Sequence, residues 1–508
     1  VQTCALPIYA FPAFASHIVR LSEERAAFSA ALSGDDAPAD AGPDPAAPTA
    51  ARGEALLARG LRPRAHAHPH AHPHAHEADA DHHDASPPLG GGGLTRRGFL
   101  VATGFGFAGA VTGCGRPPES HLAAPAAGSE DVVPGRATWY ASTCGGCAAG
   151  CGIVVRCRDG RPVKVEGNPE HPVSKGGLCA VGQAALIGLY DSKRLLRPRL
   201  RGRDASWAAA DARVIEGLAA AKAAGTSVRI LSSTFTGRAT QAAIDDFLRG
   251  YPGAEHVVYD ALSTSALLDA HARTRGVRVA PRVRLERCET IVGIDADFLG
   301  AGVSPVEHAR GRREARSPEA AKPRFALHVQ VESALTLTGT NADRRHRIDA
   351  GRAADVVAHL VRRVAERTPT RPEAAAAPKP GGEAPLDAAT LDALADRLVA
   401  TRGRSVILCG TNDVDVQALV ALGNELLGAY EAVLDVATPS RQRAGDDAAL
   451  EGLVEELEAG TVGALVVAGC DPVTEAPGGR RLAAALAKVA LRVGLAERED
   501  ATTAGLEV

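Results

Sequence analysis

Three cysteines lie within eight residues in the stretch Cys144-Gly-Gly-Cys147-Ala-Ala-Gly-Cys151, and Cys179 follows in a second glycine-rich turn. Four thiolates are what a 4Fe-4S cube needs, one for each iron. Glycine has no Cβ, so the backbone around the first three cysteines can wrap closely and turn N–H groups toward sulfides. We therefore predict that Cys144, Cys147, Cys151 and Cys179 are the metal ligands of a 4Fe-4S cluster.

Two other uses of these cysteines stay open. A zinc ion also accepts four thiolates, although zinc ribbons repeat a Cys-x2-Cys pair and this chain has one such pair. Disulfides would suit an exported protein, although three closely spaced cysteines are awkward to pair with one distant partner. Four more cysteines lie on or beside apolar strands and are predicted to be buried small hydrophobic residues: Cys157, Cys288, Cys409 and Cys470.

A small domain at 129–200 is predicted around the cysteine motif. The stretches 153–158 and 163–166 are typical of two strands, and Asp159-Gly160 between them is typical of a two-residue hairpin turn. The domain is therefore predicted to combine the cluster loop with a β-hairpin.

Residues after 205 alternate between helix and strand patterns, which favours parallel sheets covered by helices. Strands are predicted at 228–231, 256–259, 290–294, 327–331, 405–408, 432–436, 464–468 and 491–495. Residues 368–385 (TPTRPEAAAAPKPGGEAP) are predicted to be a linker. The fold class is therefore α/β: a small N-terminal 4Fe-4S domain, followed by Rossmann-like parallel-sheet domains at 205–367 and 386–508, the second one truncated.

The phrase Val165-Glu-Gly-Asn-Pro-Glu-His-Pro172 follows the hairpin. With this phrase and the cysteine motif, residues 136–198 resemble the iron–sulfur domain of the molybdopterin oxidoreductase family. The resemblance implies an oxidoreductase in which the four cysteines named above bind a 4Fe-4S cluster. It also implies a helix after the fourth cysteine, from Gln183 to Tyr190.

Further segments resemble a narrower branch, the large iron–sulfur subunits of alternative complex III and of menaquinone reductase complexes. That resemblance implies a membrane-associated respiratory complex, with quinone-interacting membrane subunits and cytochrome c or ferredoxin-like subunits as partners. The segments are 297–300, 304–307, 329–332 and 338–343.

The wider family binds molybdenum in a molybdopterin guanine dinucleotide, and this sequence departs from the family pattern there. Asp471 of Gly469-Cys-Asp-Pro472 stands where the family has Asn near the pterin, and Val181 stands where it usually has Lys or Arg. No molybdenum ligand is identified; the residues considered were Ser263, Ser265 and Cys288. We expect little or no molybdenum, and no catalytic or pterin-binding residue is assigned.

The first 94 residues are predicted to be a disordered low-complexity segment, because little apolar surface is available to offset the entropy of ordering. Residues 1–8 (VQTCALPI) resemble translated adapter sequence and are excluded. Alternating histidines between His66 and His83 can bind divalent metal, but a solvated tract is the simpler interpretation because nothing would fix the ligand geometry. The sequence contains no methionine, and we expect a fragment truncated at both ends.

Residues 95–114 resemble a twin-arginine export signal. Arg96 and Arg97 precede an apolar, glycine-rich stretch at 101–111. That stretch is shorter than the about 20 residues of a membrane span but suits a signal peptide. Cys114 occupies a lipoprotein acceptor position. We expect export to the periplasmic face of the cytoplasmic membrane, with a lipid anchor at Cys114 as a further hypothesis; the alternative is a short buried helix.

Length and charge narrow the classes of function. The chain has 508 residues, enough for about three folded units at roughly 150 residues each. Its 57 basic and 60 acidic residues give a net charge of −3, which argues against a nucleic-acid partner bound through phosphate neutralisation. Three hypotheses follow: an electron-transfer subunit with one 4Fe-4S cluster, an active molybdenum bis-pterin oxidoreductase acting on a small oxyanion or sulfur compound, and a scaffold without catalysis.

Overall fold

The computed structural model describes residues 135–318 and 325–508. The predicted low-complexity segment, the twin-arginine segment with Arg96 and Arg97, and Cys114 lie outside the described residues. Within the described ranges, no helix is long and apolar enough to cross a membrane.

The first described domain is built on a three-stranded antiparallel sheet in the order β1-β2-β3. Its strands are β1 (Ala137–Thr143), β2 (Gly152–Arg158) and β3 (Arg161–Gly167). Asp159 and Gly160 have φ angles of 49° and 76°, which is the left-handed pair that a type I′ hairpin turn requires. The hairpin predicted from the sequence is therefore confirmed.

Two short helical segments follow this sheet. The α-helix α4 (Ala180–Ala184) continues directly into the 3-10 helix η2 (Ala185–Tyr190), so the helix expected over 183–190 is found in a tighter form. A small hairpin of β4 (Arg199–Leu200) and β5 (Arg203–Asp204) then leads into the α/β region.

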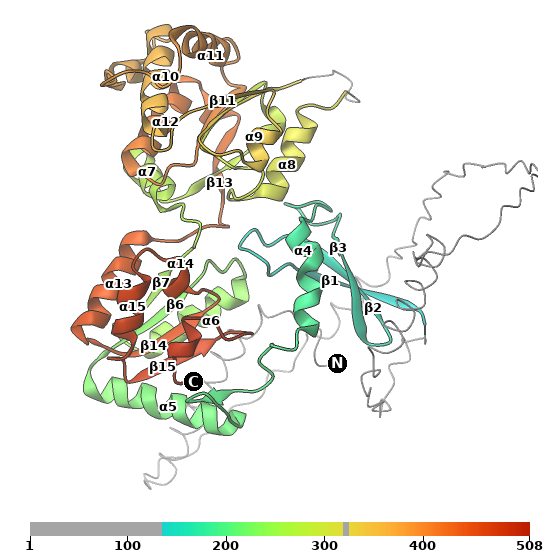
Figure 1. Cartoon of the computed structure of the whole chain (residues 1–508), viewed down its shortest axis with the longest axis vertical. Helices are drawn as coiled ribbons and strands as arrows, with labels where there is room; N and C mark the ends of the chain where they lie inside the picture. The colour runs from blue at the N-terminus through green and yellow to red at the C-terminus, as the bar shows by residue number, and fades with distance from the viewer. Residues whose placement is uncertain (1–134, 319–324) are drawn as a thin grey trace, which may run out of the picture. The chain divides into compact units, whose positions relative to one another are not determined.

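The first α/β unit has a parallel sheet in the order β15-β14-β6-β7 (Figure 1). One face packs against α5 (Trp207–Ala224) and α6 (Arg238–Gly250), and the other against α13 (Asp447–Ala459) and α15 (Gly479–Leu486). Helices on both faces explain why β14 is apolar and buried along its whole length. The strands are β6 (Ser227–Ser232), β7 (Glu255–Val258), β14 (Val462–Ala468) and β15 (Leu491–Leu495).

The second α/β unit has a parallel sheet in the order β11-β10-β9-β12. Its largest core joins the sheet to α10 (Ala353–Arg367), α11 (Ala388–Ala400) and α12 (Val414–Leu426). Three further helices lie between β7 and α10 in the chain: α7 (Ser265–Arg275), α8 (Pro305–Glu314) and α9 (Leu337–Thr340). The strands are β9 (Thr290–Ile294), β10 (Leu327–Glu332), β11 (Arg344–Arg347) and β12 (Ser405–Cys409).

An antiparallel ribbon of two strands completes the α/β region. It pairs β8 (Ala280–Val283) with β13 (Leu434–Ser440). The strand predicted at 432–436 is therefore present, but it does not join a parallel sheet.

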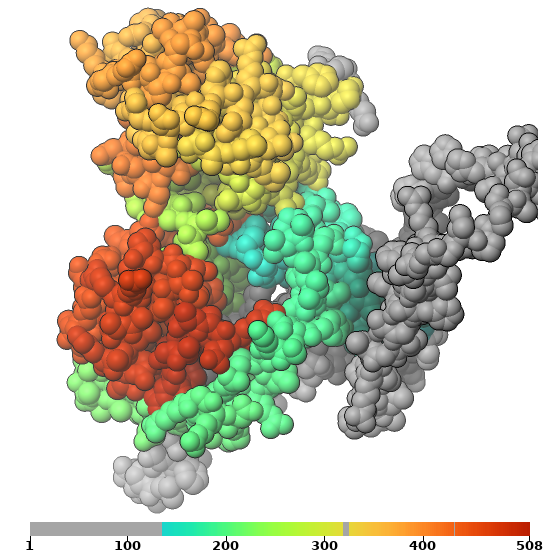
Figure 2. Space-filling view, viewed as in Figure 1, coloured from blue at the N-terminus to red at the C-terminus, as the bar shows by residue number. Residues whose placement is uncertain are grey.

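The α/β fold class is confirmed, whereas its division into consecutive units at 205–367 and 386–508 is wrong. Each parallel sheet takes strands from both sides of the predicted linker at 368–385. Figure 2 shows the same interleaving, since the surface of the first unit carries both green segments near residue 210 and red segments after 440. The predicted linker joins α10 to α11 within one core, where Ala377 is buried.

Candidate metal centre

The four cysteines come from one loop and one helix start. Cys144, Cys147 and Cys151 lie in the loop between β1 and β2, and Cys179 is the N-cap residue of α4. Cys144 and Cys151 are buried, whereas Cys147 and Cys179 are exposed. All four are free thiols, so the disulfide alternative finds no support at this site.

The cysteine loop closes on itself through backbone hydrogen bonds. Cys144 N donates to Cys151 O at 2.8 Å, and Gly150 N donates to Cys147 O at 3.3 Å. Gly150 has a φ of 56°, a left-handed conformation that glycine adopts without the Cβ penalty. The loop therefore depends on glycine at this position, as its composition indicated.

Two other glycines bring the loop and α4 together. Gly146 N lies 3.5 Å from Cys144 Sγ, and Gly182 N lies 3.4 Å from Cys179 Sγ, each in hydrogen-bond geometry. A Cβ at Gly182 would stand 3.4 Å from Cys144 Sγ. The start of the motif therefore lies beside the helix that begins at Cys179, although 35 positions separate the two cysteines (179 − 144).

The two buried thiols have raised pKa values, which a bound positive charge would lower. Burial, with the nearby Cys144, Cys147 and Cys179, raises the pKa of Cys151 to about 11. Burial is also the main cause of the raised pKa of Cys144, against which the Gly146 N–H acts. The four thiols are thus close enough to repel one another as thiolates, and bound metal offsets both penalties by stabilising the deprotonated form.

A zinc ion and a 4Fe-4S cluster make different demands on the four thiolates. Among residues 135–318 and 325–508, no three Cys, His, Asp or Glu side chains are placed to hold one metal ion. Four-thiolate zinc needs all sulfurs at about 2.3 Å from one point, whereas each thiolate of a 4Fe-4S cube binds a different iron. Four thiolates are the donor set of either kind of site.

The loop after β3 braces the chain that leaves Cys151. Gly152 N donates to Ser174 Oγ at 3.1 Å, and Ser174 N donates to His171 Nδ1 at 3.1 Å. The ring of His171 fills the space in which a Cβ of Gly152 would stand. His171 lies within the motif at 165–172, but the sequence alone indicated no role for it. Ser174 lies just outside that motif and was not identified from the sequence.

Residues 137–191 match the family model of the molybdopterin oxidoreductase Fe4S4 domain. This part of the chain is therefore a domain of the molybdopterin oxidoreductase Fe4S4 type.

Three curated relatives are similar to parts of the chain. The menaquinone reductase, molybdopterin-binding-like subunit of Nitratidesulfovibrio vulgaris is 47% identical over 81 residues, 15% of this chain and 12% of the relative. A nitrate reductase of Symbiobacterium thermophilum is 36% identical over 119 residues, 22% of this chain and 15% of the relative. A sulfite dehydrogenase subunit of Allochromatium vinosum is 42% identical over 77 residues, 15% of this chain and 8% of the relative. The matches therefore span less than a sixth of each relative.

The residues considered as molybdenum ligands are all engaged elsewhere. Ser263 Oγ donates to Asp447 Oδ2 at 2.7 Å, and Ser265 Oγ donates to Asp269 Oδ2 at 3.0 Å. Cys288 is fully buried, and burial raises its pKa far above the ordinary value. None of the three side chains is available as a ligand in this structure.

The two residues that depart from the family pattern are placed differently. Val181 lies in α4 beside Gly146 and is 64% exposed. Asp471 Oδ1 accepts hydrogen bonds from Thr502 N at 2.9 Å and Thr502 Oγ1 at 2.5 Å. Burial alone would raise the pKa of Asp471, but hydrogen bonds from Thr502 and Thr474 outweigh it and lower the pKa. Asp471 is therefore an ionised carboxylate tied to its own chain.

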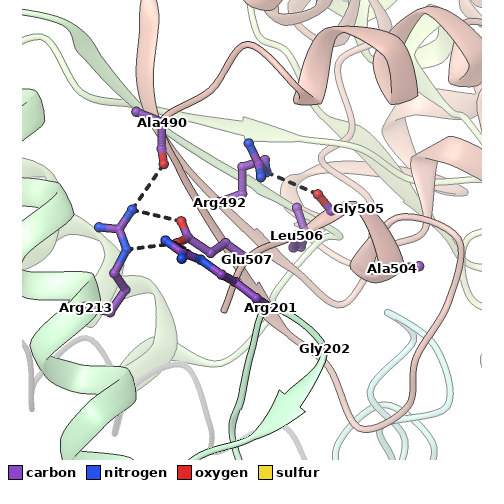
Figure 3. Close-up of a pocket in the computed structure, with 9 residues that line it drawn as sticks. All are labelled: Arg201, Gly202, Arg213, Ala490, Arg492, Ala504, Gly505, Leu506 and Glu507. Atoms are coloured by element: carbon purple, nitrogen blue, oxygen red, sulfur yellow. Dashed lines mark hydrogen bonds and ion pairs between the residues drawn. The ribbon is translucent and has the colours of Figure 1, made fainter.

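A hollow of about 610 Å³ is lined by residues of 201–213 and 490–507, none of which belongs to the cysteine motif (Figure 3). Arg201 and Arg213 both donate to the buried carboxylate of Glu507, and Arg492 donates to Gly505 O. These contacts tie the β4–β5 hairpin and α5 to the segment after β15. Because the guanidinium groups bind their own chain, we interpret the hollow as structural.

Proposed function

We propose that this chain is an electron-transfer subunit of an oxidoreductase, with one 4Fe-4S cluster held by the thiolates of Cys144, Cys147, Cys151 and Cys179. The observation that carries the proposal is the convergence of four free thiols, two of them buried, inside a domain that matches the family's Fe4S4 model. A cluster bound there would supply one-electron transfer.

The chain's own residues would divide the work at this site. Cys144 and Cys151 anchor the inner side, where burial excludes water, and Cys147 and Cys179 hold the exposed side. The N–H groups of Gly146 and Gly182 already point at ligand sulfurs, and such hydrogen bonds set the potential of iron–sulfur sites. An exposed cluster edge gives electrons a short route to a docked partner.

The test is iron analysis of anaerobically purified full chain. We expect four irons per chain and a reduced-state EPR signal in the wild type. Cys147→Ala removes an exposed ligand at little cost to packing, so it should lose iron and signal while the fold remains. Cys409→Ser, which changes a thiol outside the motif, is the control and should keep both. Full iron in Cys147→Ala, or zinc in the wild type, would contradict the proposal.

We further propose that the subunit works in a quinone-linked respiratory complex at the periplasmic face of the cytoplasmic membrane, after twin-arginine export. The name of the Nitratidesulfovibrio vulgaris relative, a menaquinone reductase subunit, supports this setting. The partners would be quinone-interacting membrane subunits and cytochrome c or ferredoxin-like subunits. Reduction of the cluster by a quinol in the complex purified from its host tests the proposal, and a cluster that no quinol reduces would favour the scaffold hypothesis.

The second candidate is an active molybdenum bis-pterin oxidoreductase acting on a small oxyanion or sulfur compound. The nitrate reductase and sulfite dehydrogenase relatives favour it, whereas Val181 and Asp471 weigh against it. Elemental analysis of the full-length protein from its own host separates the two. One molybdenum or tungsten per four irons, with extractable pterin, would establish the second candidate.

A further inference from the structure

The cysteine loop receives a hydrogen bond from a residue almost 300 positions away. Gln442 Nε2 donates to Ala149 O at 2.6 Å. Ala149 lies between Cys147 and Cys151 and is 6% exposed. A buried carbonyl without a hydrogen-bond partner destabilises the folded state. The bond from Gln442 therefore supplies the carbonyl of Ala149 with a donor from outside the loop.

The amide of Gln442 is held in the orientation that this bond requires. Ser440 Oγ donates to Gln442 Oε1 at 2.9 Å, and Gln442 N donates to Ser440 Oγ at 3.4 Å. With its oxygen bound to Ser440, the side chain presents its NH2 group to the loop. Ser440 is itself the last residue of β13 and pairs with Ala280 of β8.

The segment that carries Gln442 is fixed at its other end as well. Ala444 N donates to Thr234 Oγ1 at 2.8 Å, and Gly445 N donates to Asp260 Oδ2 at 3.1 Å. Asp260 is 4% exposed and also accepts from Thr234. Gln442 is therefore presented by a short segment whose two ends are anchored to the α/β region.

A second residue of the α/β region touches the loop at the next position. A Cβ added to Gly150 would stand 3.2 Å from Thr236 Oγ1, so Thr236 lies directly beside this glycine. Thr236 follows β6 in the chain, whereas Gln442 follows β13, so two separate segments contact consecutive residues of the loop. The loop between two cluster ligands is thus shaped from outside its own domain.

The bond from Gln442 continues toward a ligand residue. Ala149 O and Gly150 N belong to one peptide group, and Gly150 N donates to Cys147 O. Hydrogen bonds in such a chain polarise one another, and more so in a buried environment. The amide of Gln442 therefore strengthens the positive end of a peptide dipole beside Cys147, which favours the reduced, more negative state of a cluster.

We propose that Gln442 is a positioning residue that sets the reduction potential of the cluster through the Ala149–Gly150 peptide. The proposal rests on the proposed function, since it needs a cluster on the four cysteines. According to this proposal, a residue of the α/β region helps to set the reduction potential. A change in the conformation of that region would therefore change the reduction potential of the cluster.

The experiment is an EPR-monitored redox titration of the full chain, with iron measured on the same samples. Gln442→Leu removes the donor and should shift the midpoint potential to more negative values while four irons remain. Gln442→Glu keeps the size of the side chain but places an acceptor against Ala149 O, and should shift the potential further in the same direction. Gln417→Leu is the matched control, because Gln417 also donates to backbone carbonyls, those of Cys409 and Thr411. Its potential should equal that of the wild type.

The outcomes separate this inference from the proposed function. Iron loss in both Gln442 variants, with iron kept in the control, overturns the inference, because Gln442 would then be needed to hold the cluster and not to set its potential. A Gln442→Leu variant with full iron and an unchanged potential overturns the inference and leaves the proposed function intact, as does an equal shift in Gln417→Leu. A wild type without a four-iron cluster overturns the proposed function itself.

Discussion

Alanine at Gly152 would force a methyl group into the ring of His171. A Cβ on Gly152 would stand 2.4 Å from His171 Cγ, 2.5 Å from its Cβ and 2.6 Å from its Cδ2, whereas ordinary contacts begin near 3.4 Å. The ring cannot retreat freely, because Nδ1 is bound to Ser174, which is 1% exposed. We expect Gly152→Ala to lower the free energy of unfolding by about 1–3 kcal/mol, the range for an overpacked core. Iron retention should fall too, because Gly152 directly follows Cys151.

The assay is denaturant unfolding of the anaerobically purified chain, with iron per chain measured on the same samples. Removing the whole side chain in the double variant Gly152→Ala/His171→Gly should restore part of the loss, with a coupling of about 0.5–3 kcal/mol between the two sites. Gly452→Ala in α13 is the control, because no atom lies within 4 Å of its Cβ position. Alanine there should stabilise the helix by up to about 1 kcal/mol. A Gly152→Ala protein as stable as the wild type, or a loss that His171→Gly does not change, would refute the reasoning.

Two further predictions concern other parts of the chain. Glu507→Gln should lower the free energy of unfolding at neutral pH by about 2 kcal/mol, because charged hydrogen bonds from Arg213 and Arg201 are lost. Those bonds lower the pKa of Glu507 below its ordinary 4.5. The difference in stability between wild type and variant should therefore be complete above pH 4.5 and shrink as the pH falls; a difference that grows in acid would contradict this. Replacing Arg96 and Arg97 with lysine should retain the protein in the cytoplasm, because lysine lacks the planar donor fork; normal yield of the variant at the periplasmic face would favour a buried helix at 101–111.

Local patterns in the sequence were sufficient for the hairpin and most strands. Asp159-Gly160 predicts its turn because both residues tolerate positive φ, and the structure has that geometry at both. The run at 290–294 predicts a buried strand because β-branched and apolar residues dominate it, and β9 has these bounds. Both predictions depend on a few adjacent residues only.

The pairing of strands could not be predicted in the same way. β14 pairs with β6 across more than 200 intervening residues, and apolar runs do not specify which neighbour they will meet. The Pro- and Ala-rich stretch at 368–385 has the composition of a linker, yet Ala377 packs into the core shared by α10 and α11. Composition indicates how a segment can bend, whereas packing depends on the helices at its two ends.

In the candidate site, too, some residues could be predicted from local sequence and others could not. The spacing of Cys144, Cys147 and Cys151 suggests ligands because metal chemistry restricts residue types, and the ligand assignment stays a prediction. The residues that hold the loop use ordinary groups, such as the amide of Gln442 and the hydroxyl of Ser174. Nothing in a single sequence distinguishes them from other amides and hydroxyls, since their role comes from contacts across the fold.

The balance between the two candidate functions depends on how Asp471 is held. Its lowered pKa keeps the carboxylate charged at neutral pH, and a like-charge contact at ~4 Å costs about 4 kcal/mol at an effective dielectric of 20. A pterin diphosphate near that carboxylate would meet this repulsion. If the carboxylate stays turned toward Thr502, as its hydrogen bonds require, the repulsion falls, but the site then lacks the neutral amide that the family offers. We therefore expect either position to weaken binding of a pterin diphosphate there, with no charge from Val181 to offset the loss. This is the physical reason for preferring a cluster that transfers electrons without a molybdenum centre in this chain.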